Sequence, residues 1–231
     1  METSTPILET RDLMKAYGKG DNRFVALHGL SLKVQQGESI AILGKSGSGK
    51  STLMHLLALL DKPTEGSVSI NGQDASKLKG RKLDQLRNQG FGFVFQQFFL
   101  NANASVLENV ILPLKIAGVP SKERVKRGLA VLKQVELEDK AHNKANDLSG
   151  GQKQRVVVAR ALINNPKVIF ADEPTGNLDS ATGATIMNLL FSLNEKHGIT
   201  LVIVTHDRDL AERCHRQVEI KDGQVIKEVE V

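Results

Sequence analysis

The sequence predicts an α/β fold in which a parallel sheet is joined by an antiparallel sheet and by an inserted group of helices. Four short and almost continuous apolar runs are typical of strands buried on both faces of a parallel sheet. Segments with helical spacing separate these runs, as the crossover connections of parallel strands require. Near the N-terminus apolar and polar residues alternate instead, which indicates a half-exposed antiparallel sheet. The four apolar runs are Ser39–Leu43, Phe91–Phe95, Val168–Ala171 and Leu201–Val204.

The antiparallel segments come first in chain order. Ile7–Leu13 has the composition of a strand, and apolar residues alternate with polar ones at Leu32–Val34 and at Val68–Ile70. The pair Asn71-Gly72 directly follows the last of these segments, and this dipeptide favours a tight hairpin turn. The first third of the chain is therefore expected to consist mainly of strands.

The middle of the chain, about 98–165, is expected to be helical. Ser121 is placed to cap a helix with an apolar side that begins at Val125. Ser149 is placed to cap a second helix, which Pro166 must end because proline lacks the backbone donor.

The tail is expected to form a further hairpin, with Asp222-Gly223 as its turn. Neither an internal repeat nor a low-complexity linker divides the sequence, so one domain is expected over 1–231. Within it, the expected parts are a β-subdomain plus core over about 1–97 and 166–231, and a helical subdomain over about 98–165.

Composition and charge exclude several classes of protein. With 231 residues, 40% hydrophobic and 25% charged, the chain is globular rather than disordered or fibrous. Its one cysteine excludes an internal disulfide framework, and no run approaches the roughly 18 consecutive apolar residues of a spanning helix. Met1–Pro6 lacks a signal-peptide pattern. The net charge of +5 suits anionic partners, but only 4% aromatic residues make nucleic acid the weaker choice.

Gly44–Ser51 fits the phosphate-loop pattern G-x-x-x-x-G-K-[ST]. It follows the apolar run that ends at Leu43 and opens an apolar helical segment. Glycines let the backbone turn its N–H groups toward phosphates, and the helix N-terminus adds positive potential. Lys50 is expected to reach the β- and γ-phosphates, and the Ser51 hydroxyl to ligate Mg²⁺. The candidate nucleotide-binding residues of this segment are Gly44, Lys45, Ser46, Gly47, Ser48, Gly49, Lys50, Ser51 and Thr52.

Two carboxylates, Asp172 and Glu173, follow the apolar run Val168–Ala171. A buried parallel strand would deliver both to the carboxyl edge of its sheet, where open α/β sheets bind ligands. Asp172 then suits a Mg²⁺ ion, and Glu173 suits polarising the attacking water. An exposed strand end would also account for the pair, and it is the phosphate loop that favours the functional interpretation.

Leu148–Gln152 carries a second candidate anion site. Ser149 and Gln152 match the S-x-x-Q capping box at the start of a helix. Gly150 and Gly151 leave backbone N–H groups accessible to an anion. The simpler interpretation is a helix cap alone.

Together, Gly44–Ser51, Leu148–Gln152 and Asp172-Glu173 resemble, in this order, the motifs of the ATP-binding-cassette (ABC) ATPases. The resemblance covers essentially the whole chain. It implies a P-loop NTPase (RecA-like) core with an antiparallel β-subdomain and an inserted α-helical subdomain. It also implies ATP and Mg²⁺ as ligands, and a head-to-tail homodimer in which one copy's phosphate loop and the other's Ser149–Gln152 enclose ATP.

Further positions match the family one by one. Tyr17 is similar to the aromatic residue that stacks on adenine, although a strand-end tyrosine is the alternative. Gln96 resembles the glutamine that senses Mg²⁺ and the attacking water, with Gln97 as the other candidate. Asp179 lies in a segment similar to the loop that crosses the dimer interface, and His206 resembles the switch histidine that bonds the γ-phosphate. The resemblance thus implies catalytic roles for Glu173, His206 and Gln96, and metal ligation by Ser51, Gln96 and Asp172.

Two segments, Ala171–Asp179 and Leu107–Val110, resemble the subgroup of macrolide and peptide exporters and lipoprotein-release ATPases. This implies a separate integral membrane subunit with a cytoplasmic coupling helix, and a cytoplasmic chain, peripheral on the inner face of the membrane. The coupling helix would dock beside Gln96, with Phe98–Leu100 as apolar anchors unless they belong to the helical core. Asn101–Ser105 is more polar than relatives usually are there, which leaves the identity of the partner open.

Other functions remain as alternatives. An importer ATPase would share the same cassette chemistry. A soluble ABC ATPase acting on ribosomes or DNA is disfavoured, because the chain has one phosphate loop and no long coiled-coil insertion. A non-hydrolysing cassette is disfavoured because every catalytic position is filled. A basic cluster favours a solvated helix face over a membrane-facing patch: Lys77, Lys79, Arg81, Lys82 and Arg87.

Overall fold

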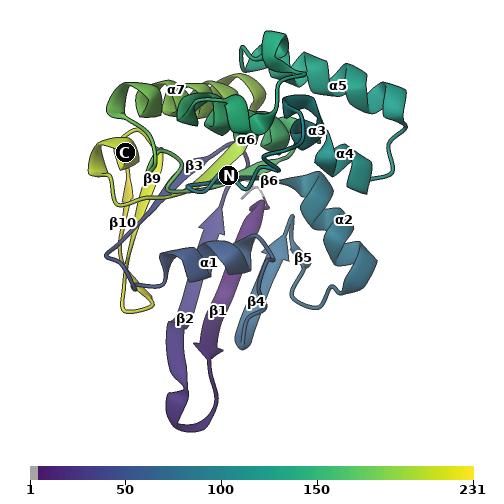
Figure 1. Cartoon of the computed structure of the whole chain (residues 1–231). Helices are drawn as coiled ribbons and strands as arrows, with labels where there is room; N and C mark the ends of the chain where they lie inside the picture. Colours follow the sequence, from purple (N-terminus) through teal and green to yellow (C-terminus); the bar gives the residue numbers. More distant parts are fainter. Residues whose placement is uncertain (1–4) are drawn as a thin grey trace. The chain divides into compact units, whose positions relative to one another are not determined.

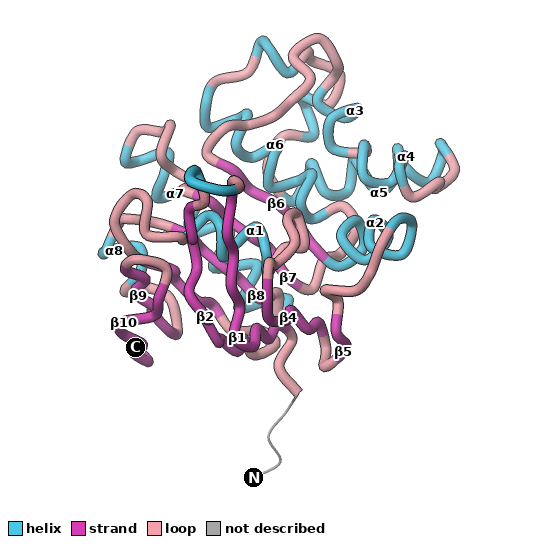
Figure 2. The backbone as a smooth tube through the Cα atoms, turned by 90° about the horizontal axis from the view of Figure 1, so that it is seen from below, coloured by secondary structure: helices cyan, strands magenta, loops and turns pink. Residues whose placement is uncertain are grey.

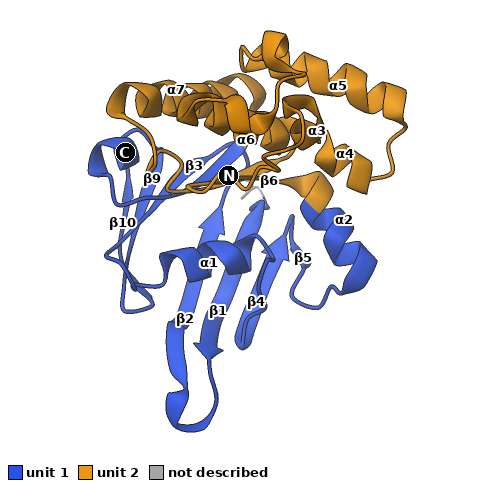
Figure 3. Ribbon diagram, viewed as in Figure 1, with its two compact units in different colours: residues 1–87, 200–231 blue, residues 88–199 orange. Residues whose placement is uncertain are grey.

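A computed structural model describes residues 5–231. The chain divides into two compact units, one of Met1–Arg87 with Thr200–Val231 (unit 1) and one of Asn88–Ile199 (unit 2), shown in Figure 3. Both units contain strands and helices, so the predicted α/β class is confirmed. The predicted helical subdomain over about 98–165 has other boundaries than these units and stays a prediction.

Unit 1 contains an antiparallel sheet with the strand order β2-β1-β4-β5. Its strand β1 pairs Leu8 with Val34 of β2 and with Ile70 of β4. Figures 1 and 2 show β1 between β2 and β4. On β4 the apolar Val68 and Ile70 are buried at alternate positions, as the sequence predicts. The strands are β1 (Leu8–Tyr17), β2 (Phe24–Val34), β4 (Glu65–Ile70) and β5 (Gln73–Asp74).

The parallel strands of unit 1 position the phosphate loop. Strand β3 pairs in parallel with both β8 and β9, and β9 pairs antiparallel with β10. Every residue of β8 is buried, as are the first four of β3, which explains their almost continuous apolar sequence. Helix α1 follows β3 and buries Leu53, Met54, Leu56 and Leu57. The elements are β3 (Ser39–Leu43), α1 (Lys50–Leu57), β8 (Thr200–Val204), α8 (Arg208–Ala211), β9 (Arg216–Lys221), β10 (Gln224–Glu230) and the 3-10 turn η1 (Gly20–Asn22).

Both predicted hairpin turns are present. Asn71-Gly72 joins β4 to β5, and Asp222-Gly223 joins β9 to β10. All four residues have positive φ, between 49° and 74°. This left-handed conformation at both central positions is the one that a two-residue hairpin requires.

Unit 2 is built on two parallel strands, β6 and β7, paired from Phe91 with Val168 to Phe95 with Asp172. Phe170 packs edge-on against Phe91, with ring centroids 5.2 Å apart. The elements are β6 (Phe91–Phe95), α3 (Val106–Val110), α4 (Leu112–Ile116), α5 (Ser121–Gln134), η2 (Glu138–Lys140), η3 (Ala145–Asp147), α6 (Gly150–Leu162), β7 (Val168–Asp172) and α7 (Ser180–His197).

The start of α5 differs from the prediction. Pro120, not Ser121, is the N-cap residue, and Ser121 is the first helical residue. The Pro120 carbonyl accepts the first helical hydrogen bond, from Arg124 N at 3.0 Å, so the proline takes the capping position. Val125 is exposed, because close packing begins one turn later at Gly128, where an added Cβ would lie 2.5 Å from Leu107 Cδ1.

Helix α2 (Gly80–Gly90) buries none of its residues and carries Arg81, Lys82 and Arg87 of the predicted basic cluster. Lys77 and Lys79 precede this helix, so the five residues do not share one helix face. Arg87 on this helix is paired with Asp84. No helix within residues 5–231 is long and apolar enough to cross a membrane.

Candidate active site

The phosphate loop of unit 1 needs glycine at positions where the backbone turns. Gly44, Gly47 and Gly49 have φ values of 150°, 80° and 104°. A Cβ on Gly44 would lie 2.2 Å from Ile220 O, and one on Gly49 would lie 2.7 Å from Ala26 O. Conformation therefore explains all three glycines, and lack of space is a second reason at Gly44 and Gly49.

The start of α1 is open to an anion. Gly49 is the N-cap residue, and no side chain among the described residues caps the helix. The first N–H groups of a helix carry partial positive charge and bind phosphate in this situation. Lys50 Nζ donates to the carbonyls of Gly44 and Lys45 at 2.8 and 3.0 Å, so it lies under the loop.

Ser48 Oγ is buried and lacks a hydrogen-bond partner within the described chain. A buried hydroxyl without a partner loses free energy unless a ligand or water supplies one. The loop thus has uncapped donors, a cation and an unsatisfied polar atom, which fits a phosphate group.

Tyr17 lies at the end of β1 and is 40% exposed. Its hydroxyl donates to Asp61 Oδ2 at 3.0 Å, and Lys15 Nζ lies 4.7 Å from the ring centroid. Burial is the largest effect on the Tyr17 hydroxyl and raises its pKa, and the Asp61 carboxylate raises it further. Adenine stacking on this ring stays a prediction.

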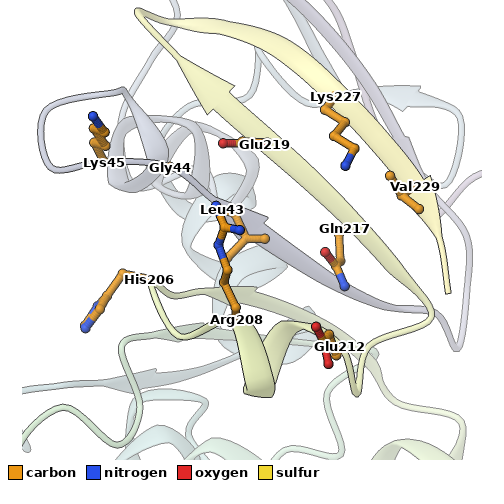
Figure 4. A pocket seen from close by; sticks show the side chains of 10 residues that line it. All are labelled: Leu43, Gly44, Lys45, His206, Arg208, Glu212, Gln217, Glu219, Lys227 and Val229. Carbon is orange, nitrogen blue, oxygen red and sulfur yellow. The ribbon is translucent and has the colours of Figure 1, made fainter.

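His206 follows β8 and lines a pocket of about 510 Å³ with Gly44 and Lys45. Unit 1 therefore brings the predicted switch histidine close to the beginning of the phosphate loop. In Figure 4, His206 and Lys45 lie at one end of this pocket, while Lys227 and Val229 of β10 line the other. The remaining lining residues are Leu43, Arg208, Glu212, Gln217 and Glu219.

The parallel register of unit 2 brings two of the three predicted catalytic residues to one sheet edge. Phe95 and Asp172 are paired at the ends of β6 and β7, so Gln96 and Glu173 directly follow neighbouring strands. This is the carboxyl-edge placement that the apolar runs predict. Glu173 has a φ of 45°, a left-handed conformation that is strained for a residue with a side chain.

The predicted capping box at the start of α6 is confirmed. Ser149 Oγ accepts from Gln152 N at 3.3 Å, and Gln152 Oε1 accepts from Ser149 N at 3.0 Å. A Cβ on Gly151 would lie 2.4 Å from Thr182 Cγ2, so the glycine permits close contact with α7.

Asp179 is the N-cap residue of α7, and its Oδ1 accepts from Thr182 N at 3.0 Å. The hydrogen bonds from Thr182 lower the pKa of the Asp179 carboxyl below its ordinary value. The Gly151–Thr182 contact therefore places the capping-box segment beside the helix start that Asp179 caps. A role of Asp179 across a dimer interface stays a prediction.

Two amide side chains of unit 2 were missed by the sequence reasoning. Gln154 is fully buried on α6, and its Nε2 donates to Pro174 O at 2.5 Å and to Phe95 O at 3.3 Å. Asn177 bonds to Gln96. The position of Gln154 among the apolar residues of α6 could have indicated a buried amide. The sequence around Asn177 contains no comparable signal.

The predicted site residues are thus divided between the units. Unit 1 carries Tyr17, Gly44–Thr52 and His206, and unit 2 carries Gln96, Ser149–Gln152, Asp172, Glu173 and Asp179.

Known proteins support this interpretation. The lipoprotein-releasing system ATP-binding protein LolD of Alcanivorax borkumensis is 46% identical over 96% of this chain and 98% of its own length. The macrolide export ATP-binding/permease protein MacB of Nitrosomonas europaea is 49% identical over 96% of this chain, which spans only 34% of that relative. A dimeric structure of the cassette MJ0796, bound to ADP and Pi, has a TM-score of 0.88 and 45% identity and covers 96% of this chain and 98% of its own.

The profile of the family described as ABC transporter matches residues 27–176, a range that includes the phosphate loop, the capping-box segment and both carboxylates. The chain therefore belongs to the ABC transporter family and is an ATP-binding domain of it.

Proposed function

We propose that the chain hydrolyses ATP as the energising subunit of an exporter-type ABC transporter, in a dimer of two copies. The observation that carries this proposal is the pairing of an open phosphate loop with a complete capping-box segment and strand-end carboxylates in one chain. The similarity to proteins named for macrolide export, pyoverdine export and lipoprotein release favours an exporter over an importer.

The phosphate loop binds the triphosphate of ATP. Phosphate charge is neutralised by the backbone N–H groups at the start of α1 and by the Lys50 ammonium. On binding phosphate, Lys50 gives up its hydrogen bonds to the carbonyls of Gly44 and Lys45. By the family resemblance, the Ser51 hydroxyl and the Asp172 carboxylate would hold Mg²⁺, which would neutralise charge on the phosphate oxygens.

Hydrolysis needs a water oriented toward the γ-phosphate. Glu173 accepts a hydrogen bond from this water and polarises it, and Gln96 would orient the water and contribute its amide oxygen to the metal ion. His206 donates a hydrogen bond to the γ-phosphate. Its place beside Gly44 and Lys45 supports this role.

A second copy completes each site. Ser149, Gly150 and Gly151 at the start of α6 contact the phosphate held by the other copy's loop. Support comes from the solved cassettes of similar sequence, which are dimeric. ATP therefore joins two copies, and hydrolysis releases them.

A membrane subunit receives this motion, so the chain works in the cytoplasm, peripheral on the inner face of the membrane. Phe98–Leu100 forms the apolar part of the docking surface. Phe99 is 64% exposed, which supports an anchor rather than a core residue. Arg160 donates to the carbonyls of Phe98 and Phe99 at 3.0 and 2.7 Å, which holds the segment in place.

The Glu173→Gln variant tests the proposal. It keeps the shape of the side chain but removes the base, so the hydrolysis rate should fall by about 10²–10⁴-fold while ATP binding persists. Light scattering after size exclusion should show a dimer of this variant in Mg-ATP and a monomer without nucleotide. Equal rates for wild type and variant, or a monomer at saturating ATP, would contradict the assignment.

A further inference from the structure

The loop that follows Glu173 holds Gln96 by two hydrogen bonds. Asn177 Nδ2 donates to the backbone carbonyl of Gln96 at 2.8 Å. Gln96 Nε2 in turn donates to Asn177 Oδ1 at 3.3 Å. We propose that Asn177 is a positioning residue, which sets the end of the Gln96 amide that faces the metal ion. This role rests on the proposed ATP hydrolysis.

The two bonds fix the orientation of both amides. A backbone carbonyl only accepts, so the NH₂ end of Asn177 must face Gln96 O, and Oδ1 becomes its other end. Oδ1 also only accepts, so Gln96 must turn its own NH₂ end toward Asn177. Gln96 Oε1 is then the opposite end, and an amide oxygen, not an amide nitrogen, is the ligand that Mg²⁺ prefers.

Gly176 adds a steric restraint on the same side chain. A Cβ at this position would lie 2.7 Å from Gln96 Nε2 and 3.0 Å from its Cδ. The Gly176 backbone N–H also donates to Glu173 O at 3.0 Å, which closes the turn. The loop therefore starts at the predicted base, Glu173, and four residues later Asn177 contacts the predicted metal-sensing residue, Gln96.

Asn177 is well suited to a positioning role because its side chain lies outside the buried core. It is exposed, and the strand ends are held independently by buried Gln154 through Pro174 O and Phe95 O. Removal of the Asn177 amide should therefore leave the loop in place but free the Gln96 side chain to rotate. Residues that orient a metal ligand typically affect metal affinity or activity by about 10–100-fold.

The test measures metal binding by the full chain without turnover. Mn²⁺ replaces Mg²⁺ in the presence of a non-hydrolysable ATP analogue, and electron paramagnetic resonance reports the protein-bound ion and its half-occupancy concentration. Asn177→Ala should raise this concentration about tenfold. Gln96→Ala should raise it by at least as much, and the double variant should show no further increase, because Asn177 acts through Gln96.

Asn164→Ala is the matched control, since Asn164 Nδ2 also donates to a backbone carbonyl of unit 2, that of Asn88, at 2.7 Å. It should leave Mn²⁺ binding unchanged. Unchanged binding in Asn177→Ala, an equal loss in the Asn164 variant, or a further loss when Asn177→Ala is added to Gln96→Ala would overturn the positioning role. Wild-type chain that binds neither the analogue nor Mn²⁺ would instead contradict the proposed ATPase function, so the two failures are distinguishable.

Discussion

The two helix starts proposed to contact ATP are prepared in opposite ways. Helix α1 begins at Gly49 without a side-chain cap, so its first donors are available to a ligand. Helix α6 begins with a reciprocal capping box in which Ser149 and Gln152 already satisfy each other's backbone N–H. The start of α1 is thus a binding site within one copy. At the start of α6, in contrast, the backbone N–H groups of Ser149 and Gln152 already have partners and need none from a ligand. This difference predicts that ATP binds the phosphate loop first and recruits the second copy afterwards.

The strongest test of whether the two helix starts of one site come from different copies mixes two inactive variants. Lys50→Ala removes a charge from the phosphate loop, and Ser149→Arg blocks the capping-box segment. In a mixed dimer one site carries both changes and the other carries neither, so the mixture should regain a substantial part of the activity that each variant alone lacks. Steady-state ATPase assays of the separate and mixed variants measure this. A mixture as inactive as its components would mean that each site is completed within one copy.

A pair of glycine substitutions sharpens the role of the loop. Both Gly49→Ala and Gly47→Ala place a Cβ at positive φ, which costs about 1–2 kcal/mol. Only Gly49→Ala also brings that Cβ within 2.7 Å of Ala26 O, because Gly47 has open space around it. Nucleotide titration should therefore show a much larger loss of ATP affinity for Gly49→Ala. Equal losses would mean that backbone strain, not space, decides the effect.

The N-caps Ser149 and Asp179 of unit 2 give the smallest expected effect. Ser149→Ala should lower the free energy of unfolding by about 1 kcal/mol, equally at pH 6 and pH 3.5, because a hydroxyl does not titrate there. The Asp179 carboxyl has a lowered pKa, so its stabilisation is present above the ordinary value of 3.8 and is lost as the pH falls through the lower folded value. Asp179→Asn should therefore reduce the loss of stability on acidification.

Chemical denaturation at the two pH values measures both effects. Two results would show that the caps do not determine these changes in the free energy of unfolding. One is a destabilisation by Ser149→Ala that differs between the two pH values, and the other is an Asp179→Asn variant that loses as much stability on acidification as wild type.

Sequence reasoning succeeded where a local pattern dictates local structure. The apolar runs gave β3 and β6 to the residue, and the glycine spacing gave the phosphate loop. It failed at Ser121, because proline at the preceding position took the cap, and at Val125, because packing starts only at Gly128. Asn177 was missed because its hydrogen bond with Gln96 joins segments 81 residues apart, and no periodicity encodes such a pair. The apolar neighbours of Gln154 indicated a buried amide, but not its partner Pro174, 20 residues away.

At Glu173 the requirement of catalysis conflicts with the stability of the fold, because the proposed base occupies a left-handed backbone position. Glycine would adopt a φ of 45° without steric cost, so relief of the turn would come from the very change that removes the carboxylate. Screens for heat resistance alone should therefore enrich Glu173→Gly among inactive survivors. A screen for more stable variants must therefore also select for ATP turnover, because a substitution that relieves strain at Glu173 removes the proposed base.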